Sequence, residues 1–245
     1  MVPEDKLDNF VRLLRDTAGP NLESVILYGS VVSKEFDPEF SNLNVFCVLR
    51  ETSFRALAAL EPATRWWDRQ KQPPPLFMTR EELQRSTDVF TIELLDMSQH
   101  YRVLFGEDVL QNLRIPMQFH RIQVEYELRE KLILLRKAVT LASASDQRLW
   151  DLLVRSLASF LTLFRHALIA LGEPAPPQKR ETVQALAKRV GFDPSAMNQV
   201  LDVREQKAKR KALDVRAVFA GYLSAVEQVN AAVDRILESD VSDRS

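Results

Sequence analysis

The spacing of apolar residues changes near Phe119, and this change limits the chain to a fold with two different parts. Before that point, short apolar runs alternate with helical segments and are separated by glycine and proline. After it, apolar residues recur every three or four positions, as in helices that bury one face. The pattern predicts an α+β domain over residues 1–118, followed by an all-helical bundle domain over residues 119–245.

The first region reads as a mixed sheet flanked by helices. The apolar runs at 25–28 and 45–49 are continuous rather than alternating, which is typical of strands covered on both faces. A helix is expected over 53–70, with Ser53 as its N-cap, and Thr79 with Glu82 has the form of a capping box. A further strand is expected over 89–97.

The second region shows helical stripes from end to end. The clearest lies within 149–171, shorter helices are expected near 180–190 and 194–204, and a long one covers 218–236. The helix after Phe119 has a stripe expected to face the bundle core: Ile122, Tyr126, Leu128, Leu132, Leu135 and Val139.

Composition excludes several classes of protein. The chain has 245 residues, a net charge of −1 and a single cysteine, Cys47, so it forms no internal disulfide. Cys47 lies in an apolar run and is expected to be a buried, inert thiol. No stretch approaches the 18 or so uncharged apolar residues of a membrane span, so a cytoplasmic location without membrane contact is expected.

Polar residues at the ends of the apolar runs form a candidate site. Gly29 and Ser30 follow the first predicted strand, where a glycine permits close approach of a ligand and a helix starting at Ser30 would attract phosphate. Asn42 and Asn44 open the second strand on one face, with Leu43 on the other. Glu93 lies within the strand expected over 89–97.

This order of elements resembles the nucleotidyltransferase superfamily related to DNA polymerase beta, including minimal and aminoglycoside nucleotidyltransferases. Tyr28-Gly29-Ser30 is similar to the family's Gly-Ser element, and Ser41-Asn-Leu-Asn-Val45 falls where its paired carboxylates belong. Glu93 is similar to its third carboxylate, and 101–108 looks like the segment that follows. The resemblance covers most of residues 20–110 and implies a nucleoside triphosphate partner and a Mg²⁺ site.

The departure from that pattern concerns the metal. Asn42 and Asn44 are neutral amides where the resemblance implies the carboxylates that hold two divalent cations. Mg²⁺ prefers anionic oxygen ligands, and an amide oxygen does not bridge two cations as a carboxylate does. The leading hypothesis is therefore a catalytically degenerate nucleotidyltransferase-like protein that retains nucleotide or phosphate binding at Gly29 and Ser30.

Two alternatives stay open. The first is an active enzyme that moves a nucleoside monophosphate from a triphosphate to a small hydroxylated or protein acceptor, with Mg²⁺ held by Glu93 and nearby acids. The second is a non-catalytic binding or regulatory partner of protein or RNA. Asp37, Glu39 and Asp96 are the other acids near the site, and they are expected to be solvated or to face away from it.

Other motifs carry less weight. His100, His120 and His166 share no metal-ligand spacing and are expected on the surface or in the bundle. Trp66 and Trp67 are expected to pack against the helical domain. A basic cluster is expected to be a solvated helix end, and a phosphate-facing patch for RNA or a nucleotide is the alternative. It has no interleaved aromatic residues for base stacking, and it consists of Arg204, Lys207, Lys209, Arg210 and Lys211.

Overall fold

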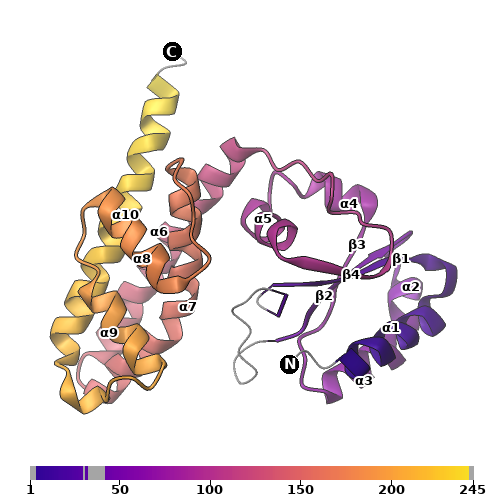
Figure 1. Cartoon of the computed structure of the whole chain (residues 1–245), viewed down its shortest axis with the longest axis horizontal. Helices are drawn as coiled ribbons and strands as arrows, with labels where there is room; N and C mark the ends of the chain where they lie inside the picture. Colours follow the sequence, from indigo (N-terminus) through magenta and orange to yellow (C-terminus); the bar gives the residue numbers. More distant parts are fainter. Residues whose placement is uncertain (1–3, 30, 33–41, 243–245) are drawn as a thin grey trace. The chain divides into compact units, whose positions relative to one another are not determined.

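The computed structural model describes residues 4–29, 31–32 and 42–242, with side chains as far as residue 235 (Figure 1). The chain forms two compact units, Met1–Pro116 and Met117–Ser245. In the described residues the first unit contains a sheet with helices and the second contains helices without strands. The α+β fold class predicted from the sequence is confirmed.

The sheet of the first unit has the strand order β3-β2-β1-β4. The two central strands pair antiparallel, β4 pairs antiparallel with β1, and β3 pairs parallel with β2. The sheet is therefore mixed. Its strands are β1 Leu22–Tyr28, β2 Asn44–Leu49, β3 Leu76–Thr79 and β4 Tyr101–Gly106.

Both faces of the two central strands are buried, which explains their continuous apolar sequences. One face, with Leu27, Val45 and Cys47, packs against α1 (Glu4–Ala18) and α3 (Glu61–Arg69). The opposite face carries Ile26, Phe46 and Val48. It packs against α4 (Arg80–Arg85), α5 (Thr91–Gln99) and the chain after β4.

The tryptophan pair lies within the first unit and not where the sequence placed it. Trp67 is fully buried and stacks on Phe10 of α1, with ring centroids 4.1 Å apart. Its indole Nε1–H donates to the carbonyl of Pro73 at 3.0 Å. The predicted packing of Trp66 and Trp67 against the helical domain is therefore wrong for Trp67, because α1 provides the aromatic surface.

The helix predicted over 53–70 is two helices. α2 covers Phe54–Ala59 and α3 begins at Glu61, with Leu60 between them and Pro62 in the first turn of α3. Proline lacks the backbone N–H that would continue the earlier helix, so its position marks the new start. The predicted cap at Ser53 is confirmed, and so is the capping box of Thr79 and Glu82.

The strand predicted over 89–97 is wrong. Residues 86–90 form turns and α5 begins at Thr91, where Leu94 N–H donates to the carbonyl of Phe90 at 3.0 Å. Ile92, Leu94 and Met97 are buried while Glu93 is exposed. The alternation that suggested a strand covers only Ile92, Glu93 and Leu94. The segment forms a helix instead, because a helix buries its apolar face against the sheet.

Five helices make up the second unit, together with the short 3₁₀ turn η2 (Arg210–Ala212). Residues 149–170 of α7 are buried on most of their circumference. The stripe predicted for α6 is only partly correct, because Leu128, Leu132 and Leu135 are buried but Ile122 and Tyr126 are 55% and 63% exposed. The helices are α6 Met117–Ala142, α7 Asp146–Ala170, α8 Lys179–Val190, α9 Ser195–Arg204 and α10 Val215–Ser242.

Within the part of the chain that the structure describes, one helix is long and apolar enough to cross a membrane, by length and composition alone. It is α7, and half of its most apolar window is buried inside the structure. A core helix of a bundle has the same composition, and α7 contacts α6, α8, α9 and α10. Its apolar character is accounted for by the bundle.

Cys47 is expected to be unreactive in the native protein. Its side chain is fully buried, and burial raises the pKa of its thiol well above the ordinary value. Because the thiolate is the reactive form, we expect Ellman's reagent at pH 8 to label the native protein at least about 100-fold more slowly than the urea-unfolded chain. Fast, stoichiometric labelling of the native protein would contradict this burial.

Labelling of the Cys47 thiol can also be used to measure the effect of a substitution at Gly106. This residue has a φ of +77°, and a Cβ built on it would lie 1.9 Å from the carbonyl oxygen of Glu23. Gly106→Ala should therefore lower the unfolding free energy of the first unit by about 3 kcal/mol or more, because the clash involves backbone. Urea titration followed by Cys47 labelling measures this, since Cys47 is the only cysteine in the chain.

Gly19→Ala is the matched control. Gly19 lies in the same unit with a φ of +53°, but a Cβ there meets nothing within 4 Å. Its substitution should cost about 1 kcal/mol from backbone conformation alone. Equal losses for the two variants would show that the close approach at Gly106 does not matter.

Candidate functional site

The candidate site lies where β1 ends. Gly29 has a φ of +87°, in the left-handed region that favours glycine. Its N–H donates to the carbonyl of His100 at 3.0 Å, and its own carbonyl accepts from the N–H of Val32 at 3.0 Å. The predicted glycine turn is thus a hydrogen-bonded turn whose backbone is held on two sides.

Among the described residues, the Asn44 side chain lies against this turn. It opens β2 directly opposite Tyr28 in the antiparallel ladder, and it is half-buried. A Cβ built on Gly29 would lie 3.1 Å from Asn44 Nδ2. The structure therefore brings together Gly29 and Asn44, which the sequence placed in one site from spacing alone.

Asn42 precedes the strand and is exposed, whereas the intervening Leu43 is buried. The N–H of Leu43 donates to Gln72 Oε1 at 2.8 Å, which holds the chain as it enters β2. The burial of Leu43 between two more exposed amides fits the predicted alternation. Four residues named in the sequence analysis lie outside the described residues: Ser30, Asp37, Glu39 and Ser41.

Glu93 does not occupy a strand. It lies in the first turn of α5 and its side chain is exposed, so the predicted strand position of the third carboxylate is wrong. Asp96, expected to face away from Glu93 on a strand, lies on the same helix and is partly buried. On the sheet itself, the β4 residue that pairs with Tyr28 is Tyr101.

Tyr101 was missed by the sequence analysis. Asn44, Tyr28 and Tyr101 form a row across β2, β1 and β4 at the end of the sheet that carries Gly29. The Tyr101 hydroxyl donates to Asp108 Oδ2 at 2.9 Å. The only signal for it in the sequence was its place in the segment 101–108, because the row depends on strand register.

The side chains of this row are neutral near pH 7. Burial raises the pKa of Tyr28. Burial also raises the pKa of Tyr101, and its hydrogen bond to Asp108 and the negative charge of that carboxylate raise it further. Asn44 does not titrate. The row therefore supplies amide and hydroxyl groups as hydrogen-bond partners, without a formal charge of its own.

These residues do not fit a Mg²⁺ site of the kind that the nucleotidyltransferase resemblance implies. Such a site needs several hard oxygen ligands, preferably carboxylates, around one ion. Among the described residues, no group of three or more His, Cys, Asp or Glu side chains is placed to hold a metal ion. The Asn44 side chain, which lies against the Gly29 turn, is an amide, and Glu93 lies on a helix.

Two of the three histidines come together in the second unit. His120 of α6 and His166 of α7 are fully buried, with His120 Nε2 2.8 Å from His166 Nδ1. Both histidines lie in the helical bundle, as expected, but their contact with each other was not predicted. His120 precedes Val124 and Leu128 at four-residue spacing, which was the available signal that it faces the core.

The predicted basic cluster is partly neutralised by its own chain. Lys207 Nζ lies 2.7 Å from Glu205 Oε2, and Arg210 Nη1 lies 2.9 Å from Asp151 Oδ1. Both pairs are at the surface, where water and salt screen them. The cluster therefore presents less net positive charge to phosphate than its sequence suggests.

The fold is that of known nucleotidyltransferases. The structure is similar to spectinomycin adenyltransferase AAD(9) from Enterococcus faecialis, solved with ATP and spectinomycin. The likeness has a TM-score of 0.57 at 15% identity and covers 91% of this chain and 99% of that chain. No protein-family model and no curated protein matches the sequence. At this identity the likeness establishes a nucleotidyltransferase-like α+β fold, and not an activity.

A double-mutant cycle tests the contact between Gly29 and Asn44. Gly29→Ala should cost about 1 kcal/mol from its backbone conformation, plus a smaller cost from the Asn44 amide. In the Asn44→Ala background that second cost should vanish, leaving a coupling of about 0.5 kcal/mol between the two substitutions in urea unfolding. Strict additivity would place Asn44 away from the turn.

Proposed function

We propose that this chain is a nucleotidyltransferase-like protein whose metal site has degenerated and which retains nucleotide or phosphate binding beside Gly29 and Ser30. The fold likeness supports the first part of the proposal. The second rests on Asn42 and Asn44, of which Asn44 lies directly against the Gly29 turn. That contact is the observation on which the proposal depends.

The charge lost with two carboxylates is large. At 4 Å and an effective dielectric constant of about 20, a divalent ion and a carboxylate attract each other by about 8 kcal/mol before desolvation. Solvent and the amide dipole make up part of this lost attraction. A net loss of a few kcal/mol in metal-binding free energy remains for each carboxylate that is replaced by an amide. Because each 1.4 kcal/mol is about a factor of ten, two amides in place of two carboxylates would remove useful Mg²⁺ affinity.

Among the described residues, no cluster of three or more His, Cys, Asp or Glu side chains stands ready to hold a metal ion in place of the lost charge. Tyr101, which lies in the row with Asn44, is neutral. The Asp108 carboxylate accepts hydrogen bonds from the Tyr101 hydroxyl and from the backbone N–H groups of Leu110 and Gln111. Glu93 projects from α5 and is exposed. Phosphoryl-type transfer relies on metal ions to neutralise developing charge, so turnover is expected to be absent or very slow.

Binding of a nucleotide does not require the same charge. Gly29 has no side chain, so a phosphate can approach its backbone closely. Asn42 and Asn44 offer amide N–H donors to the same ligand. Spectinomycin adenyltransferase AAD(9) was solved with ATP, which supports a nucleoside triphosphate as the ligand here. The protein would then act as a binding module rather than as an enzyme.

An active nucleotidyltransferase is the second candidate. The observation in its favour is that the fold likeness extends over 99% of an enzyme solved with both ATP and spectinomycin. In that case the acceptor would be a small hydroxylated molecule or a protein, with Mg²⁺ held by Glu93 and nearby acids. Metal binding separates the two candidates.

The test restores the carboxylates. Asn42→Asp combined with Asn44→Asp should lower the dissociation constant for Mn²⁺ at least tenfold relative to the wild type, because two formal charges return beside Gly29. Isothermal titration calorimetry measures this directly. Gln147→Glu combined with Gln184→Glu, two exposed positions in the second unit, adds the same charge elsewhere and should leave Mn²⁺ affinity unchanged.

Two results would contradict the proposal. A double variant that gains no Mn²⁺ affinity over this control would mean that Asn42 and Asn44 do not stand at a metal position. Wild-type transfer from any of the four nucleoside triphosphates, with Mg²⁺ or Mn²⁺ and lost in Glu93→Ala, would favour the active enzyme.

A further inference from the structure

The outer edge of β4 is an unpaired sheet edge within the described residues. β4 is the last strand in the order β3-β2-β1-β4 and pairs only with β1 there. Val103, Leu104 and Phe105 are partly exposed along it. An edge of this kind offers backbone N–H and C=O groups and apolar side chains to another chain.

α1 lies beside this edge and runs in the same direction as β4. Near its start, Glu4 forms a two-bond ion pair with Arg102, with oxygen–nitrogen distances of 3.0 and 2.8 Å. Near its end, the Arg15 guanidinium lies 4.9 Å from the ring centroid of Phe105. These two contacts attach the helix to both ends of the strand.

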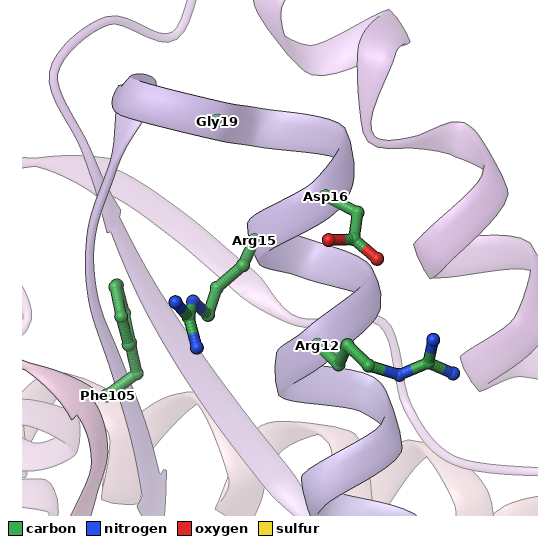
Figure 2. Close-up of a pocket in the computed structure, with 5 residues that line it drawn as sticks. All are labelled: Arg12, Arg15, Asp16, Gly19 and Phe105. Atoms are coloured by element: carbon green, nitrogen blue, oxygen red, sulfur yellow. The ribbon is translucent and has the colours of Figure 1, made fainter.

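A hollow of about 430 Å³ opens at the C-terminal end of this arrangement, lined by Arg12, Arg15, Asp16, Gly19 and Phe105 (Figure 2). Arg15 points towards Phe105, whereas Arg12 projects from another side of the helix. Arg12 donates to Asn9 Oδ1 at 2.6 Å. The hollow is therefore a shallow, charged surface beside the strand edge.

Charge is distributed unevenly along the exposed side of α1. The acids Glu4, Asp5 and Asp8 are exposed in its N-terminal half. The C-terminal half exposes Arg12 and Arg15 with a single acid, Asp16, so its charge is net positive. At 1.5 Å per residue, Glu4 and Arg15 are about 16 Å apart along the helix axis. Arg102 neutralises Glu4, but Asp8 leaves this end of the surface acidic.

We propose that this surface is a two-fold interface with a second copy of the chain. A two-fold axis pairs a surface with itself, so the surface must be self-complementary. Antiparallel placement of the two α1 helices would put the acidic half of each opposite the basic half of the other, with Asp8 facing Arg15 of the second copy. Because α1 packs on one face of the sheet, the two β4 edges would lie side by side in the layer beneath the paired helices.

The β4 edge contributes only a short stretch of backbone pairing to this interface. The register between β1 and β4 shifts at Val25 and Ile26, which leaves Leu104 as an extra residue in β4. A bulge of this kind interrupts pairing along an edge. Backbone pairing between copies would be confined to 101–103, and the charged side chains of α1 would set the alignment.

A charge-swap series tests the interface. Asp8→Arg places Arg opposite Arg15 of the second copy, and Arg15→Glu places Glu opposite Asp8, so each should raise the dimer dissociation constant at least tenfold. The double variant recreates opposite charges and should return to within about threefold of the wild type. Analytical ultracentrifugation over a protein concentration series in low salt measures all four proteins.

Arg55→Glu is the control for charge reversal, because Arg55 is an exposed residue of α2 in the same unit. It should leave the dissociation constant unchanged. A wild type that stays monomeric at 100 μM, about the upper end of such a series, overturns the proposal. Dimers that neither single variant weakens, or that the double variant does not restore, overturn it as well.

A monomer that binds heparin through Arg12 and Arg15 would assign the surface to a polyanion and would also overturn the dimer. Asp8, Glu4 and Asp16 argue against that partner, because they would repel it. The tests use the full chain and do not depend on nucleotide or metal binding, so they are independent of the proposed function.

Discussion

Burial of β1 and β2 on both faces is the constraint on which the first unit depends. Helices on each side exclude water from the two strands. The apolar contacts that result hold the helices of the first unit against the sheet. The candidate site begins where this burial ends. Gly29 and Asn44 are the first residues at that end of the strands that are not enclosed by apolar neighbours, so the core itself positions the polar groups.

Features encoded locally could be predicted from the sequence. The continuous apolar runs gave the two central strands, and the caps at Ser53 and Thr79 gave two helix starts, because each depends on residues within a few positions. Features decided by tertiary contacts could not. Three alternating residues around Glu93 suggested a strand, but packing of one side of that segment on the sheet made it a helix.

The site was predictable to the same extent. The proximity of Gly29 and Asn44 was expected from the resemblance to nucleotidyltransferases, in which the Gly-Ser element and the opening of the next strand share one site. The place of Tyr101 in the row depends on the register between β1 and β4, and the contact between His120 and His166 depends on how two helices pack. The fold likeness and the chemistry of the site are separate kinds of evidence, since one fold hosts many functions.

The side chains of Asn42 and Asn44 have nearly the same shape as aspartate, and this affects how easily the charge at these positions can change. Asparagine and aspartate have the same number of heavy atoms and differ only in whether the side chain ends in a nitrogen or an oxygen. Exchange at Asn42 and Asn44 would change charge while leaving volume and strand pairing almost untouched. Under the proposed function, the difference between a catalyst and a receptor would then lie in two side-chain atoms and would require no change of fold.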